Sequence, residues 1–368
     1  MNCLKRRMPA VLLLAALCLL TAPLALAGGE SAPHLTSLEA QVDYLVKALS
    51  DSLRTMDWKM AVMTADGFKA AGLTGKDLEI AILRAERDAA LQNTFGATLP
   101  QQIAVLGQAI RVKVGDAAAH ETLKHWAFAE LPVVAPPDYK LAATKSAEFI
   151  AAQRAFQEYL QAASRKDMAL LGLALLNEPG VAEKAVAALK TVDPASRQNS
   201  FNATPLILAA LLPDPKAGIK TLIEFCSDDK APFGVQSSVV AAAIQLAPNP
   251  KGYKAPDAAF SVQGEVQAQL PVDMLGQLSK PYVGLLKRWV PPDASKGFDY
   301  SWNTLCNAGY SFPPKTFDAE GIAAIQNTRD KATGPMAQMI QQQFNQLLTM
   351  QGVDPRLAQK PPAPPKDF

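Results

Sequence analysis

Residues 168–192 read MALLGLALLNEPGVAEKAVAALKTV, and residues 205–226 read PLILAALLPDPKAGIKTLIEFC. Each stretch begins with a run that is apolar on every side of a helix, passes a proline-bearing turn, and continues with a run that is apolar on one side. A helix that is apolar all round must be buried between neighbours, and a one-faced helix can cover it. The two stretches therefore predict stacked antiparallel helix pairs.

The proline-bearing turn recurs a third time. Pro179, Pro215 and Pro250 stand 36 and 35 residues apart, and the third turn also follows a very apolar run, residues 239–246. Proline suits such a turn because it cannot continue a helix interior. A unit of this kind that repeats and stacks on its neighbours is typical of an α-solenoid.

Residues 168–192 and 205–226, with 239–246 as the first half of a further pair, resemble the HEAT and armadillo families of helical repeats. The period is shorter than the ~40 residues usual in those families, and the tetratricopeptide period of about 34 also fits. The Trp, Leu-Gly and Tyr positions that mark tetratricopeptides are not visible here. The HEAT-like resemblance implies a curved scaffold that binds other macromolecules, and it assigns no functional residues.

Helical periodicity extends beyond the repeats. Apolar residues recur on one helical face between Leu38 and Leu53, and again at Leu78, Ile82, Ala85 and Ala89, while alternating strand-like runs are scarce. The predicted fold class is mainly α, a HEAT-like stack with one irregular aromatic loop. The predicted regions are a signal peptide (1–27), an N-terminal helical region (28–131), a linker (132–139), the helix-pair repeats (140–290), the irregular aromatic loop (291–316), C-terminal helices (317–352) and a proline-rich disordered tail (353–368).

The first thirty residues have the three parts of a bacterial Sec-type signal peptide. Lys5, Arg6 and Arg7 precede an apolar run over 11–20, and Ala25-Leu26-Ala27 precedes Gly28. The run is about half the ~20 residues of a spanning helix. We therefore expect cleavage between Ala27 and Gly28, no membrane span afterwards, and a periplasmic or secreted protein.

Cleavage changes the charge balance of the chain. The signal carries three of the 36 basic residues and none of the 34 acidic ones, so the mature chain has 33 against 34. A nearly neutral chain with mixed charges lacks the basic footprint of a nucleic-acid-binding protein. We expect another protein or a cell-envelope component as the partner.

Two cysteines remain after cleavage, Cys226 and Cys306. An oxidising compartment permits a disulfide between them, and no third cysteine competes. The alternative is two independent buried thiols, since Cys226 lies on the apolar side of a predicted helix. Our working prediction is a bridge that anchors the aromatic loop.

No motif in the sequence predicts catalysis, a metal site or a cofactor. His120 and His125 resemble the zinc-peptidase pair, but residues i and i+5 lie about 140° apart on a helix and do not converge on one ion. Gly67 and Gly72 have the spacing of a phosphate loop, yet Leu73 stands where the lysine belongs. We interpret Gly72 as a helix cap.

One aromatic cluster stands out near the C-terminus. Five of the 25 aromatic residues fall within fifteen positions: Phe298, Tyr300, Trp302, Tyr310 and Phe312. The alternation at 298, 300 and 302 is strand-like. The cluster is either a binding surface for a peptide, glycan or lipid, or a small local core. We favour the local core, because aromatic residues most often fill cores.

Two functions remain open at this point. The leading hypothesis is an exported, non-enzymatic binding or scaffold protein that uses a helical-repeat surface. The alternative is an exported cell-envelope hydrolase whose catalytic carboxylates the sequence does not single out. The scarcity of histidine and the lack of a nucleophile motif favour the first.

Overall fold

The structure is a computed structural model of the full chain that describes residues 37–92, 100–138, 146–192, 202–248, 262–291, 301–334 and 336–354. Within these ranges 76% of the residues are helical, in fifteen helices, and there is no strand. The mainly α prediction is confirmed. Within the same ranges, no helix is both long and apolar enough to cross a lipid bilayer. The predicted cleavage site at Ala27 and Gly28 lies outside the described residues.

The chain divides into two compact units. The first comprises Met1–Glu130, Ser164–Glu178 and Ala255–Glu265, and the second comprises Leu131–Ala163, Pro179–Lys254 and Val266–Phe368. One boundary, between Glu178 and Pro179, falls inside the region predicted as a single repeat array. Residues 131–138, most of the predicted linker, have no regular secondary structure.

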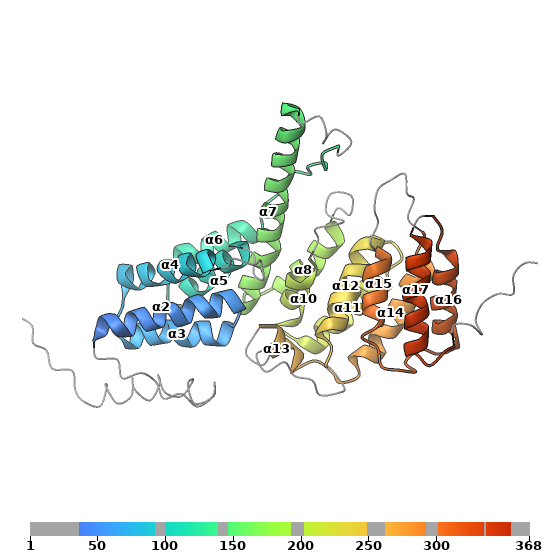
Figure 1. Ribbon diagram of the computed structural model, residues 1–368. Helices are drawn as coiled ribbons and strands as arrows, with labels where there is room; N and C mark the ends of the chain where they lie inside the picture. The colour runs from blue at the N-terminus through green and yellow to red at the C-terminus, as the bar shows by residue number, and fades with distance from the viewer. Residues whose placement is uncertain are drawn as a thin grey trace, which may run out of the picture. The chain divides into compact units, whose positions relative to one another are not determined.

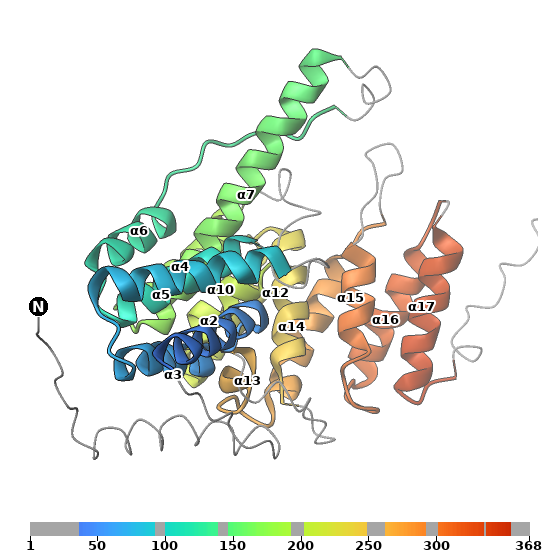
Figure 2. The same ribbon diagram turned by 60° about the vertical axis from the view of Figure 1, so that its left-hand side comes forward.

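The first unit is built on a layer of helices coloured blue to cyan (Figure 1). Helix α2 packs on both α3 and α4, α4 packs on α5, and α5 packs on α6. These helices are α2 (Leu38–Thr55), α3 (Trp58–Ala70), α4 (Gly75–Gln92), α5 (Pro100–Lys113) and α6 (Ala117–Ala127). Helices α2 and α3 lie side by side in both views of the ribbon (Figures 1 and 2).

The predicted apolar stripes form the core of this unit. Leu49 and Leu53 of α2 and Ile82 and Ala85 of α4 are fully buried, whereas Leu38 at the start of α2 is exposed. Gly72 has φ +86°, and the next amide, Leu73 N, donates to Phe68 O. This left-handed residue ends α3, so the interpretation of Gly72 as a helix cap is confirmed.

The C-terminal part of α7 (Ala147–Leu175) completes the first unit. Gly172 lies so close to α5 and α6 that an added Cβ would stand 2.9 Å from a methyl carbon of Val105 and 3.4 Å from one of Leu123. Lys166 Nζ donates to Ala129 O at 2.7 Å, just beyond the end of α6. Glycine at 172 therefore permits the close helix packing seen here.

The second unit holds the chain's most apolar helices. All of Pro205–Leu211 in α10 is buried, because α10 is covered by α8, α11 and α12. The helices of this unit are α8 (Val181–Thr191), α10 (Thr204–Leu211), α11 (Pro215–Ser227), α12 (Phe233–Leu246), α14 (Met274–Arg288), α15 (Ser301–Gly309), α16 (Ala319–Lys331) and α17 (Ala337–Met350). The short α13 (Val262–Gln267) begins in the first unit and ends in the second.

The predicted turns fall at helix ends as far as the structure describes them. In the first turn, Asn177 and Gly180 have φ +58° and +73°. In the second, Asp214 caps α11, whose first residue is Pro215. Pro250 of the third turn lies outside the described residues.

The irregular aromatic loop that we predicted for residues 291–316 is wrong for its central part. Residues Ser301–Gly309 form α15, whose buried residues include Trp302, Leu305, Cys306 and Gly309. This spacing is helical, and the strand-like alternation at 298, 300 and 302 was too short to distinguish the two periods. Phe298 and Tyr300 lie outside the described residues.

Candidate functional site

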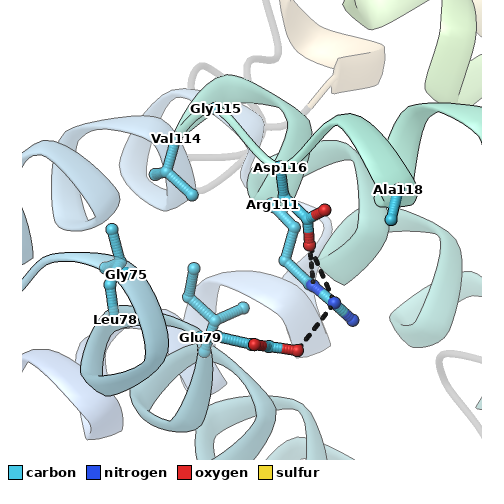
Figure 3. A pocket seen from close by; sticks show the side chains of 9 residues that line it. Gly75, Leu78, Glu79, Arg111, Val114, Gly115, Asp116 and Ala118 are labelled. Atoms are coloured by element: carbon cyan, nitrogen blue, oxygen red, sulfur yellow. Dashed lines mark hydrogen bonds and ion pairs between the residues drawn. The ribbon is translucent and has the colours of Figure 1, made fainter.

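A pocket of about 460 Å³ lies in the first unit where α4 begins and α5 turns into α6 (Figure 3). Two glycines with positive φ open this corner, Gly75 at +53° and Gly115 at +104°. Because neither carries a side chain, the backbone turns sharply there. The lining residues are Gly75, Leu78, Glu79, Ile82, Arg111, Val114, Gly115, Asp116 and Ala118.

Arg111 is the charged centre of the pocket, and two carboxylates hold it. Its Nε donates to Asp116 Oδ2 at 2.9 Å, and its Nη2 lies 2.8 Å from the same oxygen and 3.0 Å from Glu79 Oε1. Figure 3 shows the guanidinium of Arg111 lying between the carboxylates of Asp116 and Glu79. The Arg111 side chain is only 15% exposed.

Asp116 has a second role, as the N-cap of α6. Its Oδ1 accepts from Ala119 N at 3.1 Å. Burial raises the pKa of Asp116, but the hydrogen bonds from Ala119 and Arg111 and the Arg111 charge together lower it below its usual value. Asp116 is therefore ionised at neutral pH.

These contacts define what the pocket can do. The positive charge of Arg111 is already balanced by Asp116 and Glu79, so it offers little attraction to an anionic ligand. Ionised Asp116 is a weak general base, because a base works best with a pKa near the working pH. These ion pairs mainly stabilise the corner where α4, α5 and α6 meet, because Arg111 of α5 binds Glu79 of α4 and Asp116 at the start of α6.

Among the carboxylates that the structure describes, Glu86 of α4 has the pKa that departs most from its usual value. Burial raises its pKa from 4.5 to about 7, with the nearby Arg111 charge opposing this. Its Oε1 is buried and has no hydrogen-bond partner among the described residues. The carboxyl lies against α5, where a Cβ added at Gly107 would stand 2.2 Å from it. Glu86 does not line the pocket.

The two histidines of α6 have different surroundings. His120 Nε2 lies 3.0 Å from Glu178 Oε2, and Lys124 Nζ lies 3.3 Å from the other oxygen of that carboxylate. Burial raises the pKa of Glu178, while hydrogen bonds from Lys124 and His120 and their charges lower it below its usual value. His125 takes no part in this cluster and is exposed. Across the described ranges, no three His, Cys, Asp or Glu residues gather as metal ligands.

Of the two interpretations of the aromatic cluster, a binding surface or a local core, the structure supports the local core at the residues that it describes. Trp302 and Phe312 are 3% and 2% exposed, and Tyr310 is partly buried with its hydroxyl donating to Gln343 O at 3.0 Å. The ring of Phe312 packs on Tyr282 and Phe317, with centroids 5.2 and 4.9 Å away. These residues form a local core rather than a surface. Sequence reasoning missed Tyr282 and Phe317 as its members.

The Cys226–Cys306 bridge that we predicted is absent from the structure, in which both cysteines are free and buried. Cys226 lies on α11 and Cys306 on α15, and each of these helices packs on α12. Each thiol thus fills a place in the helix packing, as a small apolar side chain does.

The outer side of α4 is a feature that sequence reasoning missed. Ile80, Leu83 and Leu91 are 53%, 41% and 66% exposed. At about 100° per residue they fall within an arc of roughly 100° that also contains three basic residues, and the buried stripe lies on the opposite side. We call this surface the α4 outer face: Lys76, Ile80, Leu83, Arg84, Arg87 and Leu91.

Comparison with known proteins gives no family for the chain, because no protein-family model, curated protein or solved structure matches it.

Proposed function

We propose that the chain is an exported, non-enzymatic binding protein of the bacterial periplasm or cell exterior. The observation that carries the proposal is the α4 outer face, with three large exposed apolar side chains and basic residues between them. Scattered exposed apolar residues are ordinary, but an apolar patch gathered on one element and edged by polar groups is typical of a contact surface. The pattern of the first thirty residues supports export.

We also propose that the second unit is a HEAT-like stack of helix pairs. Its helices pack largely on their neighbours in the chain: α8 on α10, α10 on α11, and α11 on α12. Further along, α12 packs on α14 and also on α15, α14 packs on α16, and α16 packs on α17. This order of contacts supports a stacked array, in which each unit touches mainly the next one.

Among the residues that the structure describes, one carboxylate has a pKa that would suit the alternative, an exported hydrolase. Burial raises the pKa of Glu86 to about 7, a value that suits a general acid. Its Oε1 is buried between α4 and α5, and the residue does not line the pocket. A catalytic carboxyl must reach substrate, so the position of Glu86 favours the binding protein.

Capture from a bacterial envelope fraction tests the proposal. The immobilised mature chain is compared with the I80S/L83S variant and with M63S, which changes an exposed apolar residue of α3. We expect wild type and M63S to capture the same partner in similar amounts. The I80S/L83S variant should capture at least tenfold less of it. Equal capture by all three proteins would refute α4 as the binding surface. Intact mass of the exported chain should give Gly28 as the first residue.

A further inference from the structure

We propose that the α4 outer face docks an acidic amphipathic helix of a partner protein. The inference rests on the proposed function and names the partner for the same surface. It follows from the spacing of the apolar residues, from the basic residues among them, and from the acidic residues at the borders.

The apolar residues suit a helix as the occupant. Ile80 and Leu83 lie about one turn apart, and Leu91 lies two to three turns further, so the row is about 16 Å long at 1.5 Å per residue. An amphipathic helix with apolar residues at i, i+3 or i+4, i+7 and i+11 presents a row of the same length. Burial of these three side chains, now 41–66% exposed, supplies the apolar part of the contact.

The basic residues set the charge of the partner. Lys76 lies one turn before Ile80, and Arg87 lies one turn before Leu91. In the part of the chain that the structure describes, neither takes part in an ion pair, whereas Arg84 pairs with Asp43 of α2 at 2.7 Å. Two uncommitted positive charges beside an apolar row are complementary to carboxylates on the facing helix.

The borders of the face distinguish a protein helix from an anionic membrane. Asp77 and Asp88 lie along one border and Glu79 along the other. A flat anionic lipid surface would meet these acids together with the basic residues, so repulsion would oppose binding. A helix about 10 Å wide can place its carboxylates over Lys76 and Arg87 alone.

The test uses a designed peptide as the probe. It has 18 residues, the length of α4, with leucines at i, i+3, i+7 and i+11 and glutamates beside them. A second peptide replaces each glutamate by lysine. Binding to the full mature chain is measured by isothermal titration calorimetry at low and at physiological salt. We expect the acidic peptide to bind at least tenfold more tightly than the basic one, and more weakly as salt rises.

Charge exchange makes the test specific to this face. The K76E/R87E variant leaves the Arg84–Asp43 pair in place, and K47E changes an exposed lysine of α2 as the matched control. We expect K76E/R87E to bind the acidic peptide at least tenfold more weakly than wild type and to bind the basic peptide more tightly. The K47E protein should bind as wild type does. Thermal melting of each variant verifies its fold.

Four results would overturn the inference. They are no binding of the acidic peptide, equal binding of both peptides, unchanged binding by K76E/R87E, and tight binding only to vesicles of equal parts phosphatidylglycerol and phosphatidylethanolamine. If α4-dependent capture from the envelope fraction persists alongside any of them, the proposed function stands and only the nature of the partner is wrong. If that capture is also unaffected by I80S/L83S, both proposals fail.

Discussion

Helices α10 and α4 show two ways in which an apolar sequence is used. In α10 the residues Pro205–Leu211 are all apolar and all buried, because α8, α11 and α12 surround them. In α4 the apolar residues lie on two opposite sides, one in the core and one exposed. Burial follows directly from composition when a helix is apolar all round, whereas two apolar sides leave open which one packs in the core and which one stays exposed.

The largest expected effect comes from truncation in α10. Leu208→Ala should lower the free energy of unfolding by about 2–5 kcal/mol, because Leu208 is 2% exposed and its loss leaves a cavity. Leu83→Ala on the α4 outer face should change it by less than about 0.5 kcal/mol. Guanidinium unfolding followed by circular dichroism measures both. Similar losses for the two variants would mean that the α4 outer face is covered.

The next largest effect is the change in unfolding free energy with pH that Glu86 of α4 should cause. Its pKa is raised from 4.5 to about 7, so the folded protein keeps a proton that the unfolded chain releases between these values. Stability present below pH 4.5 is therefore lost as pH rises to about 7, by up to about 3 kcal/mol at 1.36 kcal/mol per pKa unit. Unfolding of wild type and Glu86→Gln between pH 4 and 8 isolates this contribution.

Gly107→Ala is the matched control for Glu86. The added Cβ would occupy the space of the Glu86 carboxyl, at 2.2 Å, and the flexible side chain should move out to solvent. The variant should then lose the pH dependence between 4.5 and 7 while keeping its helices. A pH profile identical to that of wild type would show that the carboxyl does not lie against Gly107.

A buried amide in the second unit gives a smaller effect. Gln236 is fully buried, and its Nε2 donates to Phe225 O at 2.8 Å and to Asp228 O at 2.7 Å. Its Oε1 accepts from Arg288. Gln236→Leu removes these three hydrogen bonds, one of them to a charged group, and should cost about 1–3 kcal/mol. Gln277→Leu, which removes an exposed hydrogen bond to Asp273, should cost less than about 0.5 kcal/mol.

The smallest expected effect is that of a reductant. Both cysteines are free and buried. Burial raises the pKa of the Cys226 thiol to about 12, although the nearby Arg288 charge lowers it. Burial likewise raises the pKa of the Cys306 thiol to about 11, although a hydrogen bond with Tyr310 lowers it. Dithiothreitol should leave the unfolding midpoint unchanged, whereas loss of a bridge would cost about 2–4 kcal/mol. Thiol titration of the unfolded mature chain should find two thiols. If it finds no thiols, the two cysteines are bridged after all.

Sequence patterns predicted the helices and their buried sides, because the side of a helix that packs in the core returns every three or four residues along the chain. The stripes containing Leu49 and Ile82 are buried as expected. The same reasoning took α4 to have one apolar side and overlooked Ile80 and Leu91 on the other. An apolar residue carries no mark of whether its neighbour is the same chain or a partner.

Contacts between distant segments could not be read in this way. Tyr282 packs on Phe312 thirty residues later, and Glu86 lies against Gly107 of another helix. Both depend on which helices adjoin, and periodicity within one helix does not specify that. The bridge between Cys226 and Cys306 was inferred from the compartment, from the count of cysteines and from a loop that was expected to need an anchor, and none of these specifies the distance between the two residues.

Hydroxyl-radical footprinting of the mature chain, free and bound to the partner captured from the envelope fraction, tests the central claim most directly. The account predicts that oxidation of Ile80, Leu83 and Leu91 falls at least severalfold on binding, while that of the exposed Met63 on α3 stays unchanged. Unchanged oxidation along α4, with protection confined to other helices, would contradict the assignment of the α4 outer face as the binding surface.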